Sequence, residues 1–377
     1  MVRPVSIMPI QESLLRNLGA MLDGDAKPAR LKTRTTVKVE RARLQDIADL
    51  CGVGIATVDR VLNERGNVSE KTAQKVLNAA RRLNLKRILP SSHHRLLRIE
   101  VLLARPELPL IDRMNREFAR LSERIDRSVV IQRKVLGSEA PSVLAAQIRA
   151  TNCDAVIVYA QEHAAIHEAI TFNLDRGVPT VTMISDLRSS DRIAYAGTDH
   201  YSAGKTAGFF MARMTTEPGP VLVLCNHLGF QSHEQRVRGF SDALAMHGPH
   251  LRIAEILQGG DDSDKSEHLL RAAFQSHPET LGLYNVGAAN DAVGSALRRS
   301  NFNNRPIFIG HELTHETRPM LQDGTMTLVI DQSPESQARF AVDVLLHHFD
   351  YTDHTWLTKP YESHIPFTLY SLENLPE

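Results

Sequence analysis

The segment HELTH, from His311 to His315, has the His-Glu-x-x-His spacing with which zinc-dependent hydrolases hold their metal ion. That chemistry needs a helix, because a helix places both imidazoles on one face and aims the glutamate at metal-bound water. Here the motif directly follows the apolar run PIFIG, and Pro319 lies four residues beyond it. The sequence therefore places the segment HELTH at the end of a strand and not on a helix. A solute-binding or zinc-dependent hydrolase core with an incidental helical N-terminal domain is kept as the alternative function.

Two further catalytic patterns are incomplete. Gly204-Lys205-Thr206 resembles the end of a phosphate-binding loop, but the glycine that should precede it falls at Asp199. The Gly-x-Ser-x-Gly turn of serine hydrolases does not occur in the sequence. We therefore expect a protein that is not an enzyme, with no catalytic residues, no metal and no cofactor.

Polar side chains follow the ends of several short apolar runs. Ligands of doubly wound sheets bind beyond the carboxyl ends of the strands, so these positions are the candidates for a binding site. Their planar polar groups suit paired hydroxyls or a carboxylate. The residues selected in this way are Arg105, Ser185, Asp186, Asn285, Asn290, Glu312 and Gln332.

The elements that must position these residues begin at Ile99. Short apolar runs such as RIEVLLA, AVIVYA and VLVLC alternate with amphipathic helical patterns. This alternation predicts an α/β fold with parallel sheets, and the continuous apolar character of the runs indicates that both sheet faces are covered. The chain contains more strand–helix units than a single sheet readily holds. Two doubly wound lobes are therefore expected.

The stretch from Arg43 to Asn63 predicts two short helices with a tight corner at Gly52. Neither helix can bury its apolar face alone, so both must pack on a third helix, which we expect between Ser69 and Leu83 with Ser69 as its N-cap. Three helices with this corner form a helix-turn-helix, which lays its second helix in the major groove of DNA.

Charge and cysteine content agree with such a module. The chain has 44 Lys and Arg and 44 Asp and Glu among its 377 residues, but residues 38–99 carry a local excess of seven positive charges. A basic terminal module on an acidic body is typical of DNA-binding proteins. Cys51, Cys153 and Cys225 lie too far apart for a disulfide framework, and no apolar run approaches the roughly 18 residues of a membrane span. We expect a cytoplasmic, nucleoid-associated protein without membrane contact.

The N-terminal segment GVGIATVDRVLN, followed by Asn67-Val68-Ser69-Glu70 and KVLNAARRLN, resembles the headpiece of the LacI/GalR family of bacterial transcription regulators. The resemblance implies a homodimeric repressor that binds a pseudo-palindromic operator in double-stranded DNA. It also implies that Ile55 and Ala56 read bases. Asp59 stands where the family commonly has a serine near a phosphate; because a carboxylate would repel a phosphate, we expect Asp59 to act as a cap or to pair with Arg60 or Lys71. The DNA-binding residues implied in this way are Gly54, Ile55, Ala56, Thr57, Arg60, Asn63 and Asn67.

The remainder resembles the same family's periplasmic-binding-protein-like core, in which three connections cross between two lobes. The family's Arg-x-x-Gly-aromatic motif matches RVRGF and implies that Arg236 reaches into the cleft. The effector implied by the resemblance is a sugar, polyol or sugar acid. Glu312 stands where the family usually has Asp, and the usual Asn-Asp element is stretched into NVGAAND, so the ligand is less clearly implied than the site.

The expected domains follow from these observations. The hinge helix that the family places after the headpiece is in doubt here, because Arg87 and Ile88 replace a Pro-Asn pair and Pro90 falls inside the segment. The expected boundaries are a disordered extension at 1–37, a helix-turn-helix domain at 38–84, a linker at 85–97, and an effector-binding core at 98–377, whose N-terminal lobe comprises 98–198 and 331–360 and whose C-terminal lobe comprises 199–330 and 361–377.

Overall fold

The computed structural model describes residues 43–63, 65–83, 96–188, 190–302, 305–352, 357, 361 and 365–376. The chain divides into two compact units, Met1–Leu89 and Pro90–Glu377. The expected disordered extension at 1–37 and residues 85–95 of the expected linker lie outside the described residues. Leu97, the last residue of that linker, already belongs to the first strand of the core.

The first unit is built from three helices, which are α2 (Leu44–Cys51), α3 (Ile55–Leu62) and α4 (Glu70–Arg82). Helix α2 ends at Gly52, whose φ of 67° lies in the left-handed region that favours glycine. The Ser69 hydroxyl accepts the Thr72 N–H at 3.2 Å and so caps α4. The apolar faces of the three helices meet in one core, which confirms the predicted helix-turn-helix.

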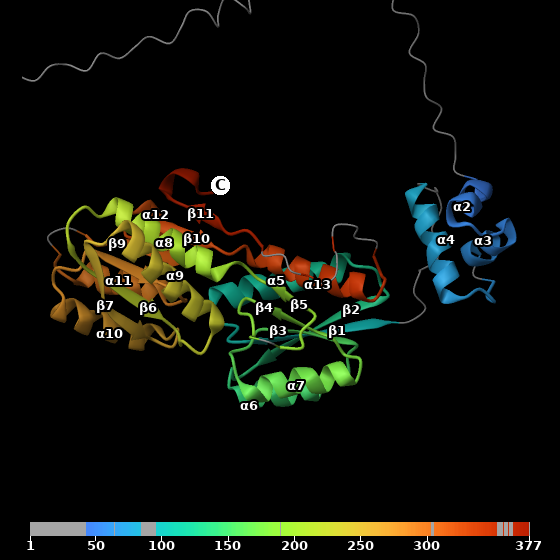
Figure 1. Cartoon of the computed structure of the whole chain (residues 1–377), viewed down its shortest axis with the longest axis horizontal. Helices are drawn as coiled ribbons and strands as arrows, with labels where there is room; N and C mark the ends of the chain where they lie inside the picture. Colours follow the sequence, from blue (N-terminus) through green and yellow to red (C-terminus); the bar gives the residue numbers. More distant parts are fainter. Residues whose placement is uncertain are drawn as a thin grey trace, which may run out of the picture. The chain divides into compact units, whose positions relative to one another are not determined.

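The N-terminal lobe of the second unit contains a parallel five-stranded sheet in the order β2-β1-β3-β4-β5 (Figure 1). Its strands are β1 (Leu97–Ala104), β2 (Val129–Leu136), β3 (Ala155–Val158), β4 (Thr180–Met183) and β5 (Ala194–Ala196). One face is covered by α5 (Pro109–Arg124) and α13 (Pro334–His348), and the other by α6 (Pro141–Arg149) and α7 (Ala164–Asp175). Because both faces are covered, the inner strands β1, β3 and β4 are buried almost throughout, whereas the edge strand β2 exposes residues 132–135.

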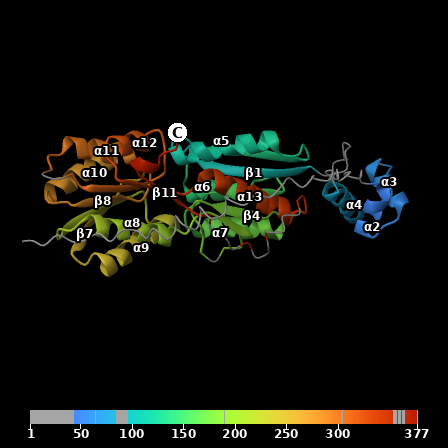
Figure 2. The ribbon, with the colours of Figure 1, turned by 90° about the horizontal axis from the view of Figure 1, so that it is seen from above.

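The C-terminal lobe contains a six-stranded sheet in the order β11-β10-β9-β8-β6-β7. Its strands are β6 (Gly219–Cys225), β7 (Leu251–Gln258), β8 (Gly282–Asn285), β9 (Ile307–His311), β10 (Leu328–Asp331) and β11 (Thr368–Tyr370). Its helices are α8 (His200–Met214) and α9 (Gln231–His247) on one face, and α10 (Ser263–Ser276), α11 (Asn290–Arg299) and α12 (Thr317–Gln322) on the other (Figure 2). Strand β11 runs antiparallel to β10, because the chain enters it from the other lobe and not through a helical crossover.

Three connections join the lobes. The chain leaves β5 for α8, returns from β10 to α13, and crosses again between Tyr361, which still bridges to Ala194 of the first sheet, and β11. The first and third connections are bonded to each other, since the Thr198 hydroxyl donates to the Ile365 carbonyl at 2.6 Å. These findings confirm the predicted two-lobed, doubly wound architecture. Among the described helices, none has the length and apolar character that crossing a membrane would require.

Candidate functional site

The headpiece presents the first turn of α3 to its surface. Gly54 is the N-cap of α3, and the Ile55 side chain directly after it is 45% exposed although it is a large apolar residue. Ala56 and Arg60 are exposed on the same helix, whereas Val58 and Leu62 are buried in the core. Of the other residues implied for DNA contact, Asn63 and Asn67 are exposed and Thr57 is half-buried. The N-terminal end of α3 therefore presents both its backbone and an exposed apolar side chain at the surface of the headpiece.

The expected partner of Asp59 is wrong. The Asp59 carboxylate accepts hydrogen bonds from Arg65 Nη1 at 2.9 Å and Asn63 Nδ2 at 2.6 Å, and not from Arg60 or Lys71. The chain turns back after α3, which brings Arg65 alongside the last turn of the helix. Asp59 is thereby neutralised, and Arg60 stays exposed.

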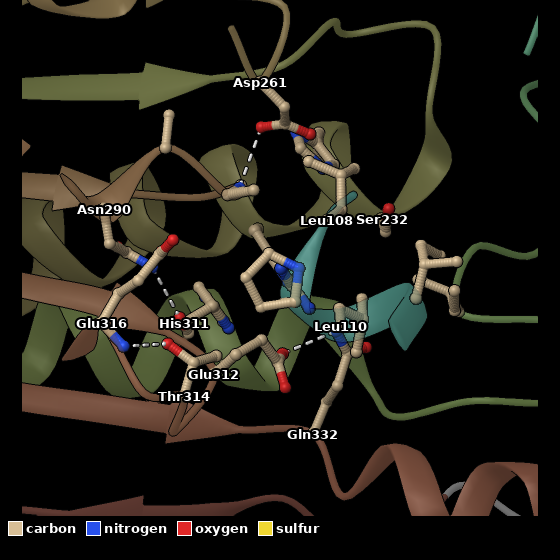
Figure 3. Close-up of a pocket in the computed structure, with 18 of the residues that line it drawn as sticks. Leu108, Leu110, Ser232, Asp261, Asn290, His311, Glu312, Thr314, Glu316 and Gln332 are labelled. Carbon is tan, nitrogen blue, oxygen red and sulfur yellow. Dashed lines mark hydrogen bonds between the residues drawn. The ribbon is translucent and has the colours of Figure 1, made fainter. Parts of the chain in front are cut away.

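A cavity of about 50 Å³ lies between the two lobes of the core (Figure 3). This is several times the roughly 10–15 Å³ that one water molecule needs, so the cavity has room for a few water-sized groups. The N-terminal lobe contributes Leu108, Pro109, Leu110, Ile111, Tyr159 and Ile184. The polar lining comes from the C-terminal lobe and includes Ser232, His233, Arg236, Asp261, Asn290 and Glu312.

Four of the eight expected effector-site residues line this cavity, namely Arg236, Asn290, Glu312 and Gln332. Asn285 lies directly behind Asn290 and donates to its side-chain oxygen at 2.8 Å, while Asn290 Nδ2 donates to the His311 carbonyl at 3.0 Å. The carboxyl ends of β8, β9 and β10 thus bring their polar residues together, as parallel strands require.

The other three expected residues do not line the cavity. Arg105 crosses between the lobes and donates to the carbonyls of Gly260 at 3.3 Å and Asp261 at 3.1 Å. The Ser185 hydroxyl is buried and accepts the Ser232 N–H at 3.1 Å. Asp186 is paired with Arg192 and with the Thr182 hydroxyl. Arg105 and Ser185 therefore join the two walls of the site, and Asp186 is bonded within the N-terminal lobe.

Arg236 is held by close packing of α8 against α9. A Cβ at Gly204 of α8 would lie 2.1 Å from the Arg236 carbonyl, so glycine is required there for the two helices to approach. The Arg236 side chain is only 3% exposed. Its Nε donates to His200 Nδ1 at 3.1 Å and its Nη1 to the Val286 carbonyl at 2.7 Å. Arg236 lines the cavity, and its Nη2 is buried without a hydrogen-bond partner among the described residues.

Glu312 carries a strongly perturbed carboxyl group. Burial, and then the neighbouring Asp331, raise its pKa to about 8. Gln332 Nε2 donates to its Oε1 at 2.7 Å. Arg113 Nη1 lies 3.6 Å from Oε2, but this guanidinium is already bonded to Asp331 and Glu335 and does not keep Glu312 ionised. Glu312 is therefore mostly protonated at neutral pH.

Residues with a left-handed backbone conformation cluster around the cleft. Six non-glycine residues with positive φ follow the carboxyl ends of strands in the two lobes, and such residues persist only where the surrounding structure holds them. They are Arg105, Ile184, Asp261, Ala289, Glu312 and Ser333. Four of them line the cavity, so the strained backbone marks the same place as the polar side chains.

Sequence reasoning missed several lining residues. Asp261 follows β7 across two glycines, so the strand-end rule applied to that strand would have found it. Ser232 and His233 precede Arg236 by one helical turn and share its face, a signal available once Arg236 is assigned. Leu108 and Leu110 open α5 and carry no sequence signal that separates them from core leucines.

The HELTH segment does not have the helical geometry that zinc catalysis needs. His311 ends β9 and is buried, whereas the His315 side chain is 82% exposed and α12 begins only at Thr317. The two imidazoles therefore share no helix face. In the part of the chain that the structure describes, no group of His, Cys, Asp and Glu side chains is arranged to hold a metal ion.

Comparisons with known proteins agree with this architecture. Residues 43–87 match the model of the bacterial regulatory proteins of the lacI family, and residues 128–352 match the periplasmic binding protein domain. The ribose import binding proteins RbsB of Salmonella typhimurium and Escherichia coli are 22% and 21% identical over 183 and 174 residues. These matches cover 48% and 45% of this chain and 60% and 57% of the relatives, so the chain spans somewhat more than half the length of these proteins.

Solved structures share the fold of the core. The glucose-galactose binding protein GanP from Geobacillus stearothermophilus is 20% identical with a TM-score of 0.68, covering 75% of this chain and 100% of its own. An ABC transporter solute binding protein from Burkholderia graminis, in complex with D-arabinose, is 20% identical with a TM-score of 0.69, covering 75% and 97%. The chain thus combines a headpiece of the lacI family of bacterial regulatory proteins with a core of the periplasmic binding protein domain family, whose model spans more than half of the chain.

Proposed function

We propose that the protein is a homodimeric, cytoplasmic transcription repressor whose affinity for a pseudo-palindromic operator is controlled by a sugar, polyol or sugar acid bound between the lobes. The observation that carries the effector site is the cavity, where buried polar side chains of one lobe face the other. The ribose, arabinose, and glucose and galactose named for the relatives and solved structures support a ligand of this class.

Control of DNA binding follows from the position of the cavity. A ligand enclosed by both lobes binds the closed arrangement better than an open one, and only such differential affinity can shift the equilibrium between them. Arg105 and Arg113 already bridge the lobes in the described arrangement. Closure around the effector would change the spacing of the two headpieces of a dimer, and with it the fit to operator half-sites.

The base-reading role of α3 is tested by exchanging Ile55 and Ala56 together for polar residues. Both side chains are apolar and exposed, so they recognise thymine methyl groups and offer no hydrogen bonds. The variant should select different sequences from a randomised DNA pool, because the groups that meet the base edges have changed. Its non-specific affinity should stay within about twofold, because non-specific binding rests on phosphate contacts that the exchange leaves in place. An Asn78 substitution on α4 serves as the control. Equal loss of affinity for all sequences would contradict base readout.

The function itself is tested by fluorescence anisotropy with an operator selected in this way. Binding should weaken steeply with salt, because log K falls by roughly 0.9 per phosphate contact for each log unit of salt concentration. A flat profile between about 50 and about 200 mM salt would overturn the assignment. Adding the effector should change operator affinity without changing affinity for random DNA.

A further inference from the structure

Four residues of the C-terminal wall of the cavity each carry a buried polar atom that has no hydrogen-bond partner among the described residues. These atoms are Ser232 Oγ, Arg236 Nη2, His311 Nδ1 and Glu312 Oε2. Each belongs to a residue that is at most 7% exposed. A buried polar group without a partner is costly, so four of them on one wall indicate that a polar ligand group completes their bonding.

The Arg236 guanidinium makes no ion pair within the described part of the chain. The hydrogen bonds of Arg236 go to a carbonyl and to His200 Nδ1, which accepts and therefore belongs to a neutral imidazole. Three acidic residues line the same wall, Asp261, Glu312 and Glu316, and Asp261 is bonded to Asn226 and the Ala288 N–H. Glu312 is held mostly neutral by its burial. The guanidinium therefore carries a positive charge at the cavity wall with no carboxylate bonded to it.

Three of the four unpartnered groups can donate. Arg236 Nη2 carries hydrogens, the Ser232 hydroxyl has one, and protonated Glu312 carries its proton on Oε2, since Oε1 accepts from Gln332. A neutral sugar hydroxyl would bond these donors but leave the guanidinium charge in place. A carboxylate accepts several hydrogen bonds and neutralises the charge at the same time.

The opposite wall has a different character. Leu108, Leu110 and Ile184 face the cavity from the N-terminal lobe (Figure 3 labels both leucines). Tyr159, the aromatic residue on this side, is stacked on Phe230 with ring centroids 5.1 Å apart. This wall suits the hydrocarbon part of a ligand whose ionised end is turned toward Arg236.

We infer that the effector is a hydroxycarboxylate, such as a sugar acid, whose carboxylate binds Arg236, Ser232 and Glu312 while its C–H groups lie against Leu108 and Leu110. The inference rests on the proposed function and narrows its ligand class from sugars, polyols and sugar acids to the acids. It assigns the side of the cavity that carries Arg236 to the carboxylate of the ligand.

The test uses the full chain and ligands matched in carbon skeleton. Isothermal titration compares D-gluconate with D-glucose and D-glucitol, and D-glycerate with glycerol. The acids should bind at least about tenfold more tightly than their neutral partners, because a hydrogen bond to a charged group is worth roughly 1.5–3 kcal/mol. Tighter binding of the neutral members, or binding of neither acid, would overturn the inference.

Variants locate the carboxylate. Arg236→Ala should remove the preference for the acid, while Arg238→Ala, an exposed arginine on the same helix, should keep it. Ser232→Ala, which deletes one unpartnered hydroxyl, should weaken acid binding several-fold and gives a second reading if Arg236→Ala fails to fold. An acid preference that survives in both site variants would place the carboxylate elsewhere and contradict the inference.

The same titrations separate this inference from the proposed function. If a neutral sugar binds best and releases the operator, the ligand class is wrong and the regulator stands. If an acid binds as described but operator affinity does not change, the ligand class stands and the proposed control of DNA binding fails.

Discussion

The two lobes have the same doubly wound construction but present different surfaces to the cavity. The C-terminal lobe supplies buried polar groups, including Arg236, Glu312 and Asp261, whereas the N-terminal lobe supplies mainly aliphatic side chains. The charged residues that the N-terminal lobe extends across the cleft, Arg105 and Arg113, bond acceptors of the opposite lobe. Under the proposed function, the C-terminal lobe would select the ligand and the N-terminal lobe would cover it.

The bond network of Arg113 is the strongest link between these surfaces. Its guanidinium binds Asp331 at 2.6 Å and the Leu313 carbonyl at 3.2 Å in the C-terminal lobe, and Glu335 of α13 with both oxygens. Asp331 is buried and also receives the Leu313 N–H at 2.9 Å. Glu312, which we propose binds the ligand, and Asp331 therefore both lie beside this one arginine.

The largest effect is expected for Arg113→Ala. Removing one partner of a largely buried ion pair leaves uncompensated carboxylates and should lower the free energy of unfolding by about 3 kcal/mol. Chemical denaturation of the full chain measures this. Arg116→Ala on the same helix breaks an exposed i,i+4 pair with Asp112 and should cost only about 0.3–0.5 kcal/mol. Similar losses of unfolding free energy in the two variants would mean that Arg113 stabilises the protein no more than an exposed surface pair does.

A pH titration tests the polar wall. Below about pH 8 Glu312 keeps its proton and donates to a ligand carboxylate; above it Glu312 is ionised and repels the ligand. Affinity for an acid should therefore fall with rising pH through this range, by at most about tenfold per pH unit for one proton. The charged groups facing Glu312 are Asp331, Arg113 and Arg236.

Two controls test whether Glu312 is the group whose titration changes the affinity. A neutral ligand should show little of the decline, since it carries no charge for Glu312 to repel. Glu312→Gln should flatten the profile of the acid between about pH 6 and about pH 9, whatever its absolute affinity, because the amide does not ionise. A decline that persists in Glu312→Gln would assign the titration to another group.

The apolar wall should contribute less per residue. Leu110→Ala removes aliphatic surface that covers the ligand and should weaken its binding by about 1 kcal/mol, or roughly fivefold. Leu121→Ala, on the same helix but packed against the core and away from the cavity, should lower stability and leave ligand affinity unchanged. If Leu110→Ala also binds normally, the N-terminal lobe does not cover the ligand in the way described.

The smallest effect is expected at the rim. Arg188 of the N-terminal lobe pairs with Glu234 of α9, and both side chains are substantially exposed to solvent. Such pairs contribute roughly 0–1 kcal/mol, so Arg188→Ala should change ligand affinity by no more than a few-fold. A larger loss of affinity, measured in the same titration, would show that the interlobe contact at the rim contributes more to ligand binding than we expect.

The sequence predicted the fold and part of the site for different physical reasons. The alternation of apolar runs with helices specifies doubly wound sheets, and the strand-end rule then finds Asn290, Glu312 and Gln332, because parallel strands end at one edge. The same rule cannot tell whether a side chain is already bonded within the protein. Arg105 is bonded to carbonyls some 155 residues away, which only the folded chain reveals.

The apolar wall and the headpiece show the same limit. Leu108 and Leu110 belong to an ordinary amphipathic helix, and only the placement of the second lobe turns them toward a cavity. In the headpiece, the helix-turn-helix followed from periodicity, yet the partner of Asp59 depends on how the chain turns after α3. Short-range patterns thus predict elements, whereas bonds between distant segments need the structure.

The most direct test of ligand-controlled DNA binding is a titration of operator release on the full chain. Fluorescence anisotropy of a labelled operator is recorded against D-gluconate and D-glycerate for the wild type, Arg236→Ala and Arg238→Ala. We expect an acid to change operator affinity at least about tenfold in the wild type and in Arg238→Ala, and to leave Arg236→Ala unchanged, since that variant lacks the cation that holds the carboxylate. An equal response in all three proteins, or none in the wild type, would contradict the account.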